Sequence, residues 1–510
     1  MESETFASYS HHLQTVAIAT IFFAICLLFP KLTYQTSLAK LPLFGNWESG
    51  EKQRQLYLNH AKKIYSAGYE KFKDSAYRVA TNDGEDNVVI APRFLPELRK
   101  LPDSVLSFPK AIDKVMEVKY TKILTDAPMI VHSVKADLTP ALARLNSVVY
   151  DEVVESLSEE IPACDDWTPV NMYMALANMV AKISGRVFVG PELCRDKDYL
   201  ESAIQYTMDV IEVQRSVKLI RPWLRPILAP RLPAVKRLRK REQMAEDLLT
   251  PIIASRLEAE RNDPTYKKPD DMLSWFMNRS ADYGGHSNAL LAKFQLGLIF
   301  AAIHTTTLTG TNILYTLASQ PEYAEPLREE IRAVMAENGG VITTRALQQM
   351  VKLDSYMKEV VRFYPLGVTS FTRKVLRGFT LSNGQYIPPG VTIETPSHAV
   401  YSDPVNYSET AHVFDGFRFS KIREGGKAAD HARNQFVTTN EQNLMFGYGR
   451  HACPGRFFAA NEIKMLVAKM LLDFDIKNEG DSQERYPNIE MGRQTSVDAR
   501  KNLLLKRVQV

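Results

Sequence analysis

The chain has 510 residues, of which 45% are hydrophobic and 24% charged, the composition of a globular protein large enough to enclose a cofactor. Its 63 basic and 59 acidic residues leave a net charge of +4, which argues against a nucleic-acid-binding protein. The four cysteines (Cys26, Cys164, Cys194 and Cys453) are widely spaced and form no C-x-x-C pair. This spacing argues against a zinc site or a disulfide framework and favours a reducing compartment.

An uncharged apolar segment near the N-terminus, residues 13–29, predicts a transmembrane helix, because its length is close to what crosses a bilayer. A cleaved signal peptide is the alternative, but such a peptide would begin with basic residues, whereas Glu2 and Glu4 stand here. The nearest positive residues, Lys31 and Lys40, follow the segment. By the positive-inside rule, residues 1–12 are therefore expected to be lumenal and the body cytosolic.

The remaining residues are expected to form a linker and one catalytic domain. Residues 30–45 are predicted to be the linker, with a hinge at Pro42, because proline forces its predecessor out of the helical region. No Ser-rich or repeated stretch divides residues 46–510. Helical periodicity covers seven segments: 140–161, 171–187, 197–219, 234–261, 289–319, 321–337 and 352–364. Short alternating runs predict strands at 77–81, 88–90, 372–381, 386–387 and 391–395. The body is thus expected to be mainly α with small β-sheets.

Residues 220–230 read IRPWLRPILAP and have two interpretations. A proline-rich surface loop is one of them. The other is a loop that dips into the bilayer interface, where Trp and Arg are favoured.

A glycine-rich segment at residues 446–455 reads FGYGRHACPG and precedes a predicted helix. Backbone N–H groups and the dipole at a helix N-terminus favour thiolate over thiol, and a thiolate is a ligand for haem iron. Glycines let the backbone close tightly around Cys453, and Phe446 can shield the sulfur from water. Alone, the pattern is also compatible with a structural turn.

This loop resembles the haem-binding signature of the cytochrome P450 family, Phe-x-x-Gly-x-Arg-x-Cys-x-Gly. Phe446, Gly449, Cys453 and Gly455 match the signature. His451 stands where the family has an arginine that pairs with a haem propionate; histidine can donate the same hydrogen bond but is charged only when protonated. The resemblance implies haem as cofactor, with Cys453 as the axial iron ligand.

Glu359 and Arg362 resemble the family's Glu-x-x-Arg pair on a helix, although a surface salt bridge is the alternative reading. Residues 414–419, FDGFRF, resemble the family's Phe-x-Pro-x-Arg-Phe segment, with Gly416 in place of the proline. The resemblance implies that Arg418 completes a buried network with a structural role.

Residues 301–306, AAIHTT, resemble the family's oxygen-activating Ala-Gly-x-Asp/Glu-Thr-Thr, with Ala302 in place of glycine and His304 in place of the acid. Thr305 falls on the critical threonine and is expected to be catalytic, with His304 in the proton supply. Plain packing, with hydroxyls bonded back to carbonyls one turn away, is the alternative.

Three further residues are weaker candidates for binding the haem propionates. Arg373 resembles the family's propionate-binding arginine at the start of a strand. His132 and Lys135 lie where a propionate-binding helix is expected, but the family's tryptophan is missing there. The resemblance covers nearly the whole chain and implies the cytochrome P450 fold.

The resemblance also implies a monooxygenase activity. Dioxygen would be activated at haem iron with electrons from an NADPH-dependent diflavin reductase, and cytochrome b5 is a second expected partner. The chain would be a single-pass protein of the endoplasmic reticulum membrane. It looks most like fungal members that tailor secondary metabolites, similar to ent-kaurene oxidase and to meroterpenoid or indole-diterpene oxygenases, which favours a terpenoid substrate.

Two other activities stay open: desaturation or rearrangement, and haem binding without turnover. Four segments are candidates for the substrate wall: 103–128, 289–304, Leu366–Phe371 and Thr495–Val497.

Overall fold

The computed structural model describes residues 2–82, 84–221, 223–283, 285 and 287–509. Contacts divide the chain into two compact units, the smaller comprising Met1–Phe108 and Thr372–Pro396 and the larger Pro109–Phe371 and Ser397–Val510. One domain is expected from residue 46 onward on the sequence alone. The smaller unit is assembled from two segments that lie far apart in the chain. A division of this kind gives no linker that could be recognised in the sequence.

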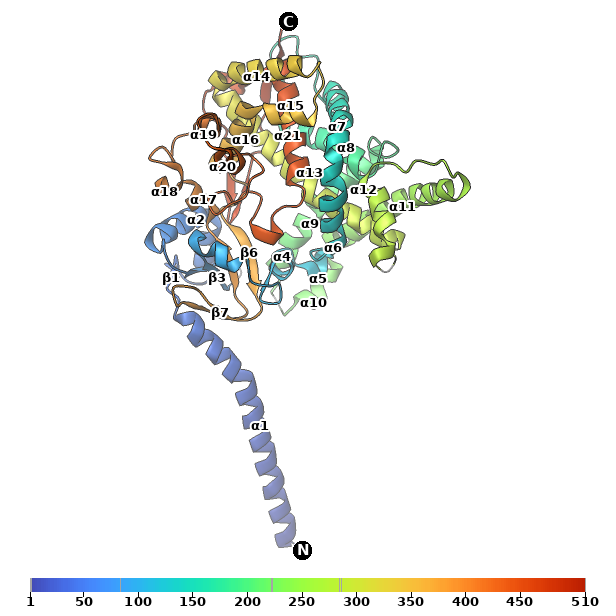
Figure 1. The fold of residues 1–510 in the computed structure, drawn as a ribbon. Helices are drawn as coiled ribbons and strands as arrows, with labels where there is room; N and C mark the ends of the chain where they lie inside the picture. The colour runs from blue at the N-terminus through green and yellow to red at the C-terminus, as the bar shows by residue number, and fades with distance from the viewer. Residues whose placement is uncertain (1, 83, 222, 284, 286, 510) are drawn as a thin grey trace. The chain divides into compact units, whose positions relative to one another are not determined.

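The smaller unit is built on a six-stranded sheet with the order β1-β2-β3-β9-β6-β4. The β2–β3 hairpin is antiparallel, whereas β3 pairs with β9 in parallel; Figure 1 shows β3 and β6 in this sheet. The elements are α1 (Glu2–Ala39), β1 (Leu43–Phe44), α2 (Gly50–Lys71), β2 (Tyr77–Ala80), β3 (Asp86–Val89), α3 (Leu95–Leu98), β4 (Leu106–Ser107), β6 (Ser370–Val375), β7 (Phe379–Thr380), β8 (Tyr386–Ile387) and β9 (Thr392–Thr395).

The larger unit is mainly helical. Its helices are α4 (Phe108–Val115), α5 (Val118–Thr121), α6 (Pro128–Ser133), α7 (Thr139–Glu160), α8 (Met172–Phe188), α9 (Lys197–Leu219), α10 (Arg225–Leu228), α11 (Pro233–Asn262), α12 (Met272–Arg279), α13 (Asn288–Ser319), α14 (Ala324–Glu337), α15 (Thr344–Gln349), α16 (Val351–Phe363), α17 (Ser397–Tyr401), α18 (Pro404–Tyr407), α19 (Arg418–Glu424), α20 (Ala428–Arg433) and α21 (Arg456–Asp473).

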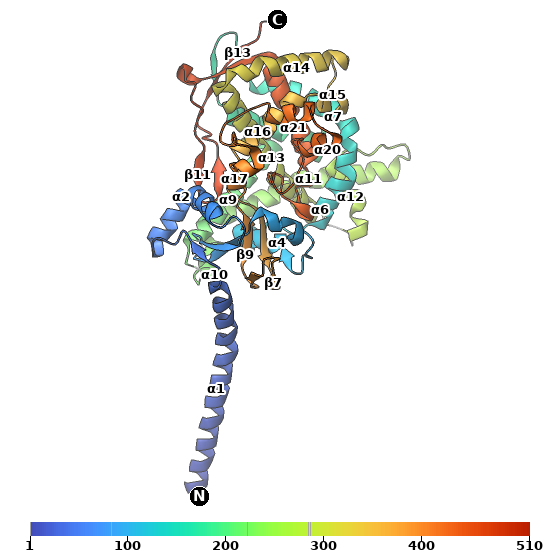
Figure 2. The same cartoon turned by 60° about the vertical axis from the view of Figure 1, so that its left-hand side comes forward.

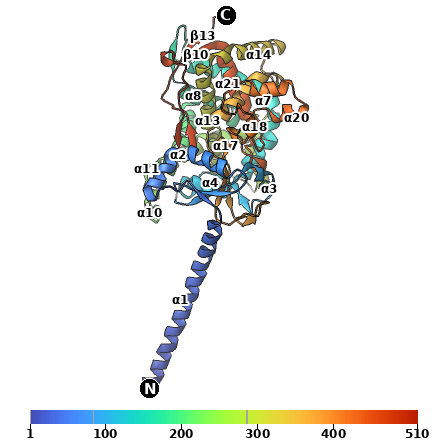
Figure 3. The same cartoon turned by 90° about the vertical axis from the view of Figure 1, so that its left-hand side faces the viewer.

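Two small sheets complete the larger unit. Strands β10 (Phe474–Asn478), β13 (Leu503–Arg507) and β5 (Thr168–Val170) form one in that order, and Figure 3 shows β10 beside β13. Strands β11 (Ile489–Met491) and β12 (Gln494–Ser496) form the other.

Helix α13 is the central element of the larger unit. It packs against α8, α9, α11, α16 and α21, and Figure 2 shows α13, α16 and α21 side by side. Its apolar residues lie on nearly all sides, which is typical of a buried core helix. Its N-terminus is capped by the Ser287 hydroxyl, which accepts a hydrogen bond from the Leu290 N–H at 3.3 Å.

The periodic segments of the sequence become helices with ends shifted by only one or two residues, except that the predicted 321–337 begins as a 3₁₀ turn, Pro321–Tyr323, before α14. The predicted strands also form. Strand 386–387 has the predicted bounds, 372–381 is divided into β6 and β7, and the others are shifted or shortened at their ends. Helix α2 carries no prediction from the sequence. Within 220–230, the described residues include two short helical turns, α10 and the 3₁₀ turn Ala229–Arg231.

Helix α1 continues past Pro30 to Ala39, so most of the predicted linker is helical. The side chains at 1–14, 24–25, 27–28 and 30–31, which include the predicted lumenal segment, lie outside the described residues. Among the described residues, α13 alone is long and apolar enough to cross a membrane, and more than half of its most apolar stretch is buried in the protein.

Candidate haem-thiolate site

The loop that carries Cys453 is closed by backbone geometry just before α21. The Cys453 N–H donates to the Phe446 carbonyl at 2.7 Å, and the Arg456 guanidinium donates to the Cys453 carbonyl at 2.9 Å. Gly447 and Gly449 have φ angles of 73° and 71°, a region that glycine adopts without steric cost. The glycines therefore permit the tight turn that the sequence analysis expected around the sulfur.

The Cys453 side chain is partly buried, and its surroundings have opposite effects on the pKa of its thiol. Burial raises the pKa of the thiol, while the backbone N–H groups of Gly455 and Arg456 and the charge of Arg456 act to lower it. The N-terminus of α21 thus favours the thiolate as predicted, but desolvation is the larger effect. A thiol in this setting loses its proton when it binds a metal cation.

Aromatic rings surround this loop. Phe446 is half-buried and meets Phe436 edge to face, with ring centroids 5.4 Å apart. Tyr448 is buried and contacts Phe371 with centroids 6.2 Å apart. His451, the residue at the family's arginine position, is half-buried in the 3₁₀ turn Gly449–His451. The loop is therefore packed against aromatic rings of the larger unit.

One face of α13 is open where the sequence analysis expected oxygen activation. Ala301 and Thr305 are exposed, whereas Ile303, His304 and Thr306 are buried. The Thr305 hydroxyl donates to the Ala301 carbonyl at 2.7 Å. That bond is the back-bonding expected of a helical threonine, and the hydroxyl oxygen keeps an accessible lone pair.

His304 points to other helices. Its Nδ1 lies 3.0 Å from the Tyr173 hydroxyl of α8, and its Nε2 lies 2.9 Å from the Ile204 carbonyl of α9. Burial lowers the pKa of the imidazole, which keeps it neutral near pH 7. Tyr173 and Ile204 could not be predicted from the sequence, because no local pattern signals a partner that distant helices supply.

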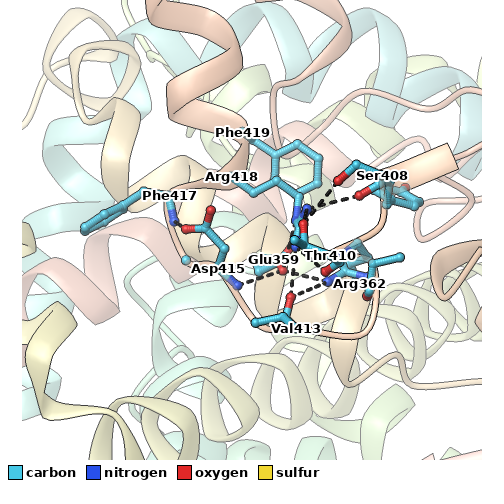
Figure 4. A network of polar contacts seen from close by, with 12 residues as sticks. Glu359, Arg362, Ser408, Thr410, Val413, Asp415, Phe417, Arg418 and Phe419 are labelled. Carbon is cyan, nitrogen blue, oxygen red and sulfur yellow. Dashed lines mark hydrogen bonds and ion pairs between the residues drawn. The ribbon is translucent and has the colours of Figure 1, made fainter. Parts of the chain in front are cut away.

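Glu359, Arg362 and Arg418 lie in one buried network (Figure 4). The Arg362 guanidinium donates two hydrogen bonds to the Glu359 carboxylate, at 2.7 and 2.6 Å, and Arg418 donates a third at 3.2 Å. Arg362 also donates to the carbonyls of Tyr401 and Ala411, each at 2.7 Å. Glu359 is fully buried, so the pair is not the surface salt bridge that was its alternative reading.

The structure explains why glycine stands at 416. A Cβ atom there would lie 2.5 Å from a ring atom of Tyr356 and 2.7 Å from one of Tyr323. The Gly416 N–H also donates to the Tyr323 hydroxyl at 3.2 Å. Proline, which the family segment has, would supply the clashing Cβ and lack the N–H.

The three propionate candidates lie in different places. His132 on α6 is exposed, and its Nδ1 lies 2.9 Å from the Tyr283 hydroxyl. Lys135 is exposed in a π-helical turn, Val134–Leu138, a conformation that often marks functional sites. Arg373 belongs to the smaller unit, where it is buried with its guanidinium 5.1 Å from the centre of the Phe108 ring. Their predicted role toward a haem stays a prediction.

These residues fit a haem. The larger unit offers a sulfur ligand in a glycine-rich turn whose backbone N–H groups favour the thiolate, and an α13 face whose exposed residues are small. A flat ring needs such close approach of backbone and small side chains on its two faces.

Two wall candidates of the larger unit are joined to each other. The Thr495 N–H donates to the Leu366 carbonyl at 3.1 Å, and the Val368 N–H donates to the Arg493 carbonyl at 2.9 Å. Gly367 and Gln494 form an antiparallel bridge between the same segments. Residues 366–371 and 495–497 therefore meet, although more than a hundred residues separate them in the chain.

Comparison with known proteins identifies the class. The model of the cytochrome P450 family matches residues 132–502. The chain is 36% identical over 498 residues to cytochrome P450 monooxygenase TES1 of Alternaria alternata, which covers 97% of this chain and 94% of the relative. It is 40% identical over 427 residues to cytochrome P450 monooxygenase ATR3 of Stachybotrys chlorohalonatus, covering 83% of this chain and 89% of the relative. It is also similar to cytochrome P450 monooxygenase paxP of Penicillium paxilli, with 36% identity over 490 residues, covering 94% of this chain and 92% of the relative.

A solved structure has the same fold. Retinoic-acid-bound cyanobacterial CYP120A1 aligns with a TM-score of 0.65 and 16% identity, covering 87% of this chain and 93% of that one. The chain belongs to the cytochrome P450 family, and its enzyme class is that of the monooxygenases. Both expectations of the sequence analysis are thereby confirmed.

Proposed function

We propose that this monooxygenase hydroxylates an apolar terpenoid or meroterpenoid intermediate of fungal secondary metabolism. The observation that carries the proposal is the open face of α13, where Ala301 and Thr305 are exposed on an otherwise buried helix. The proposal for the substrate class rests on the resemblance of the motifs at 301–306 and 446–455 to fungal members of that kind. The segments 366–371 and 495–497, which pair with each other, are proposed to form part of the substrate wall.

Haem is the proposed cofactor, and when bound it would supply the oxidising chemistry, using dioxygen and two electrons. Cys453 would hold the iron through its sulfur, with Phe446 excluding water from that side. His451, Arg373, Lys135 and His132 would bind the propionates by hydrogen bonds or by charge.

The Thr305 hydroxyl is proposed to hold and pass protons on the open face of α13. Its proton is shared with the Ala301 carbonyl, which fixes the direction of the oxygen lone pairs. A water molecule ordered by that oxygen would be placed for proton transfer. Electrons are proposed to come from an NADPH-dependent diflavin reductase, with cytochrome b5 as a second donor.

We further propose that the chain is anchored in the endoplasmic reticulum membrane by residues 13–29, with the body cytosolic. Large apolar side chains are exposed on α1, for example Val16 at 63% and Phe22 at 69%. Trp223 at 70% and Ile227 at 55% are exposed between α9 and α11, next to Leu219 at 78% at the end of α9. These exposed apolar side chains favour contact of residues 220–230 with the bilayer interface over a plain surface loop.

The test is oxidation of candidate terpenoids in microsomes that contain the chain and a reductase, under isotopically labelled dioxygen. The expected product carries one labelled oxygen per oxidation step. A product without the label would identify desaturation or rearrangement instead. The Cys453→Ser variant is the control, because a neutral hydroxyl cannot replace the thiolate donor. It should lose both the product and the red-shifted Soret band of the reduced carbon monoxide complex. If that band is present in the wild type and no terpenoid is oxidised, the proposed substrate class is wrong.

A further inference from the structure

His304 occupies a position between three helices of the larger unit. Its ring is buried, and each nitrogen has a partner on another helix: the Tyr173 hydroxyl of α8 at 3.0 Å and the Ile204 carbonyl of α9 at 2.9 Å. A carbonyl oxygen can only accept a hydrogen bond, so Nε2 must carry the proton. In the neutral ring Nδ1 is then an acceptor, and the Tyr173 hydroxyl donates to it.

The two bonds define one tautomer and one orientation of the ring. Burial lowers the pKa of His304 and raises that of Tyr173, so both groups stay neutral in this arrangement. A group that relays protons to the open face of α13 needs an atom directed toward that face. Both nitrogens of His304 are directed to α8 and α9 instead.

Few hydrogen bonds join α9 and α13 within the described residues. A small enclosed space at this contact is lined by Tyr199 and Ser202 of α9 and by Gln295 of α13. The Tyr199 and Ser202 hydroxyls have no hydrogen-bond partner within the described residues. The hydrogen bond from His304 to the Ile204 carbonyl therefore joins α9 to α13 at a contact that otherwise consists mainly of side-chain packing.

We propose that His304 is a positioning residue, which holds α9 on α13 through the Ile204 carbonyl and thereby sets the part of α13 that carries Thr305. Thr305 is the next residue of the same helix, so a shift of α9 that pulled on His304 would turn the Thr305 hydroxyl as well. In this chain the residue at the family's acid position acts through another residue and passes no proton itself.

Hydrogen exchange in the full-length holoprotein tests the tie without any substrate. His304→Leu removes the donor and keeps an apolar side chain, so the α9 amides around Ile204 should exchange about tenfold faster, as expected for losing one buried hydrogen bond. His304→Gln retains an N–H that can reach the carbonyl, and its exchange should stay close to that of the wild type. Unchanged exchange in His304→Leu would overturn the proposal.

The second measurement separates positioning from proton relay and rests on the proposed function, because it uses a terpenoid that the microsomal screen has shown to be oxidised. Peroxide formed per NADPH is compared for the wild type, His304→Gln and Thr305→Val. A glutamine cannot act as a titrating relay, so a wild-type peroxide yield in His304→Gln supports positioning. A peroxide yield of His304→Gln as high as that of Thr305→Val, with wild-type exchange in α9, would show that His304 relays protons and would overturn the proposal.

Tyr173→Phe provides an independent variant should the substitutions at 304 prevent haem binding. It removes only the hydroxyl that donates to Nδ1 and leaves the ring in place. Faster exchange of the α9 amides together with a raised peroxide yield is expected, because a loosened contact between α9 and α13 would also displace Thr305. Unchanged exchange, or a raised peroxide yield at unchanged exchange, would contradict the positioning role.

Discussion

Neighbouring residues of α13 have different surroundings because successive side chains of a helix are turned by about 100° from one another. Thr305 is exposed on the open face, and His304 is buried against α8 and α9. The motif at 301–306 contains both residues, but it carries no information about the helices that pack against α13. The direction of each side chain therefore decides which of them can meet a substrate.

Replacing Thr305 by valine keeps the shape and the β-branching of the side chain but removes the hydroxyl. We expect haem binding and the thiolate spectrum to persist while electrons are diverted into hydrogen peroxide. Loss of a positioned proton donor typically slows the assisted step by ~10²–10⁴-fold. NADPH consumption, peroxide and product are measured together.

Thr307→Val is the matched control for this variant. The Thr307 hydroxyl is buried and donates to the Ile303 carbonyl at 2.8 Å, so it is a packing threonine of the same helix. Its product yield per NADPH should stay at the wild-type value. Equal coupling in the two variants would show that Thr305 does not deliver protons.

Gly416 is a second position where a single added atom is expected to change the stability of the protein. Gly416→Ala places a Cβ against the Tyr356 and Tyr323 rings, and such overpacking typically costs ~1–3 kcal/mol. We expect a lower unfolding temperature and less bound haem. Gly425→Ala serves as control, because no atom lies within 4 Å of the added Cβ there. Equal stability of the two variants would mean that the rings move aside without cost.

Among the elements, α21 and α8 are joined by a buried carboxyl group that the sequence did not single out. Ser184 of α8 donates to one oxygen of Glu462 at 2.9 Å, and the other oxygen has no partner within the described residues. Burial raises the pKa of Glu462 to about 8. The carboxyl group is therefore mostly protonated at neutral pH, and its ionisation would place an unpaired charge between the two helices.

This raised pKa predicts how stability depends on pH. In the unfolded chain the group loses its proton near its ordinary pKa, whereas the folded protein keeps it up to about pH 8. The stabilisation is thus fully present at acidic pH and is lost as pH rises toward 8, by up to about 1.4 kcal/mol per pH unit.

The Glu462→Gln variant tests this dependence, because glutamine resembles the neutral acid and does not titrate. Its stability should fall less than that of the wild type between pH 5 and about pH 8, measured by thermal unfolding across that range. Glu424→Gln, at an exposed position, should leave the pH dependence of the wild type unchanged. A slope that is the same in all three proteins would contradict the assignment.

At the scale of the whole molecule, the proposed membrane attachment depends on α1. Ile18, Ile21 and Phe22 are exposed on this helix, and a lysine at the centre of a spanning helix costs about 2.5–3.5 kcal/mol. Replacing all three by lysine should release the protein from microsomes on alkaline extraction, with its thiolate spectrum retained. Gln35→Lys, an exposed change outside the apolar segment, should stay with the membrane. Retention of the triple variant would show that another surface anchors the chain.

The sequence by itself determined the family, the seven helices with clear periodicity and the position of the cysteine loop, because these depend on local patterns: periodicity in residues 289–319, glycines beside Cys453, and Glu359 one turn from Arg362. The order of the strands could not be predicted from the sequence, because β3 pairs with β9, a segment far along the chain. The partners of His304, the two rings that require glycine at 416 and the buried state of Glu462 were also decided by tertiary structure alone. Each depends on side chains that distant segments bring together, and desolvation, steric contact and hydrogen bonding act only after that packing has formed.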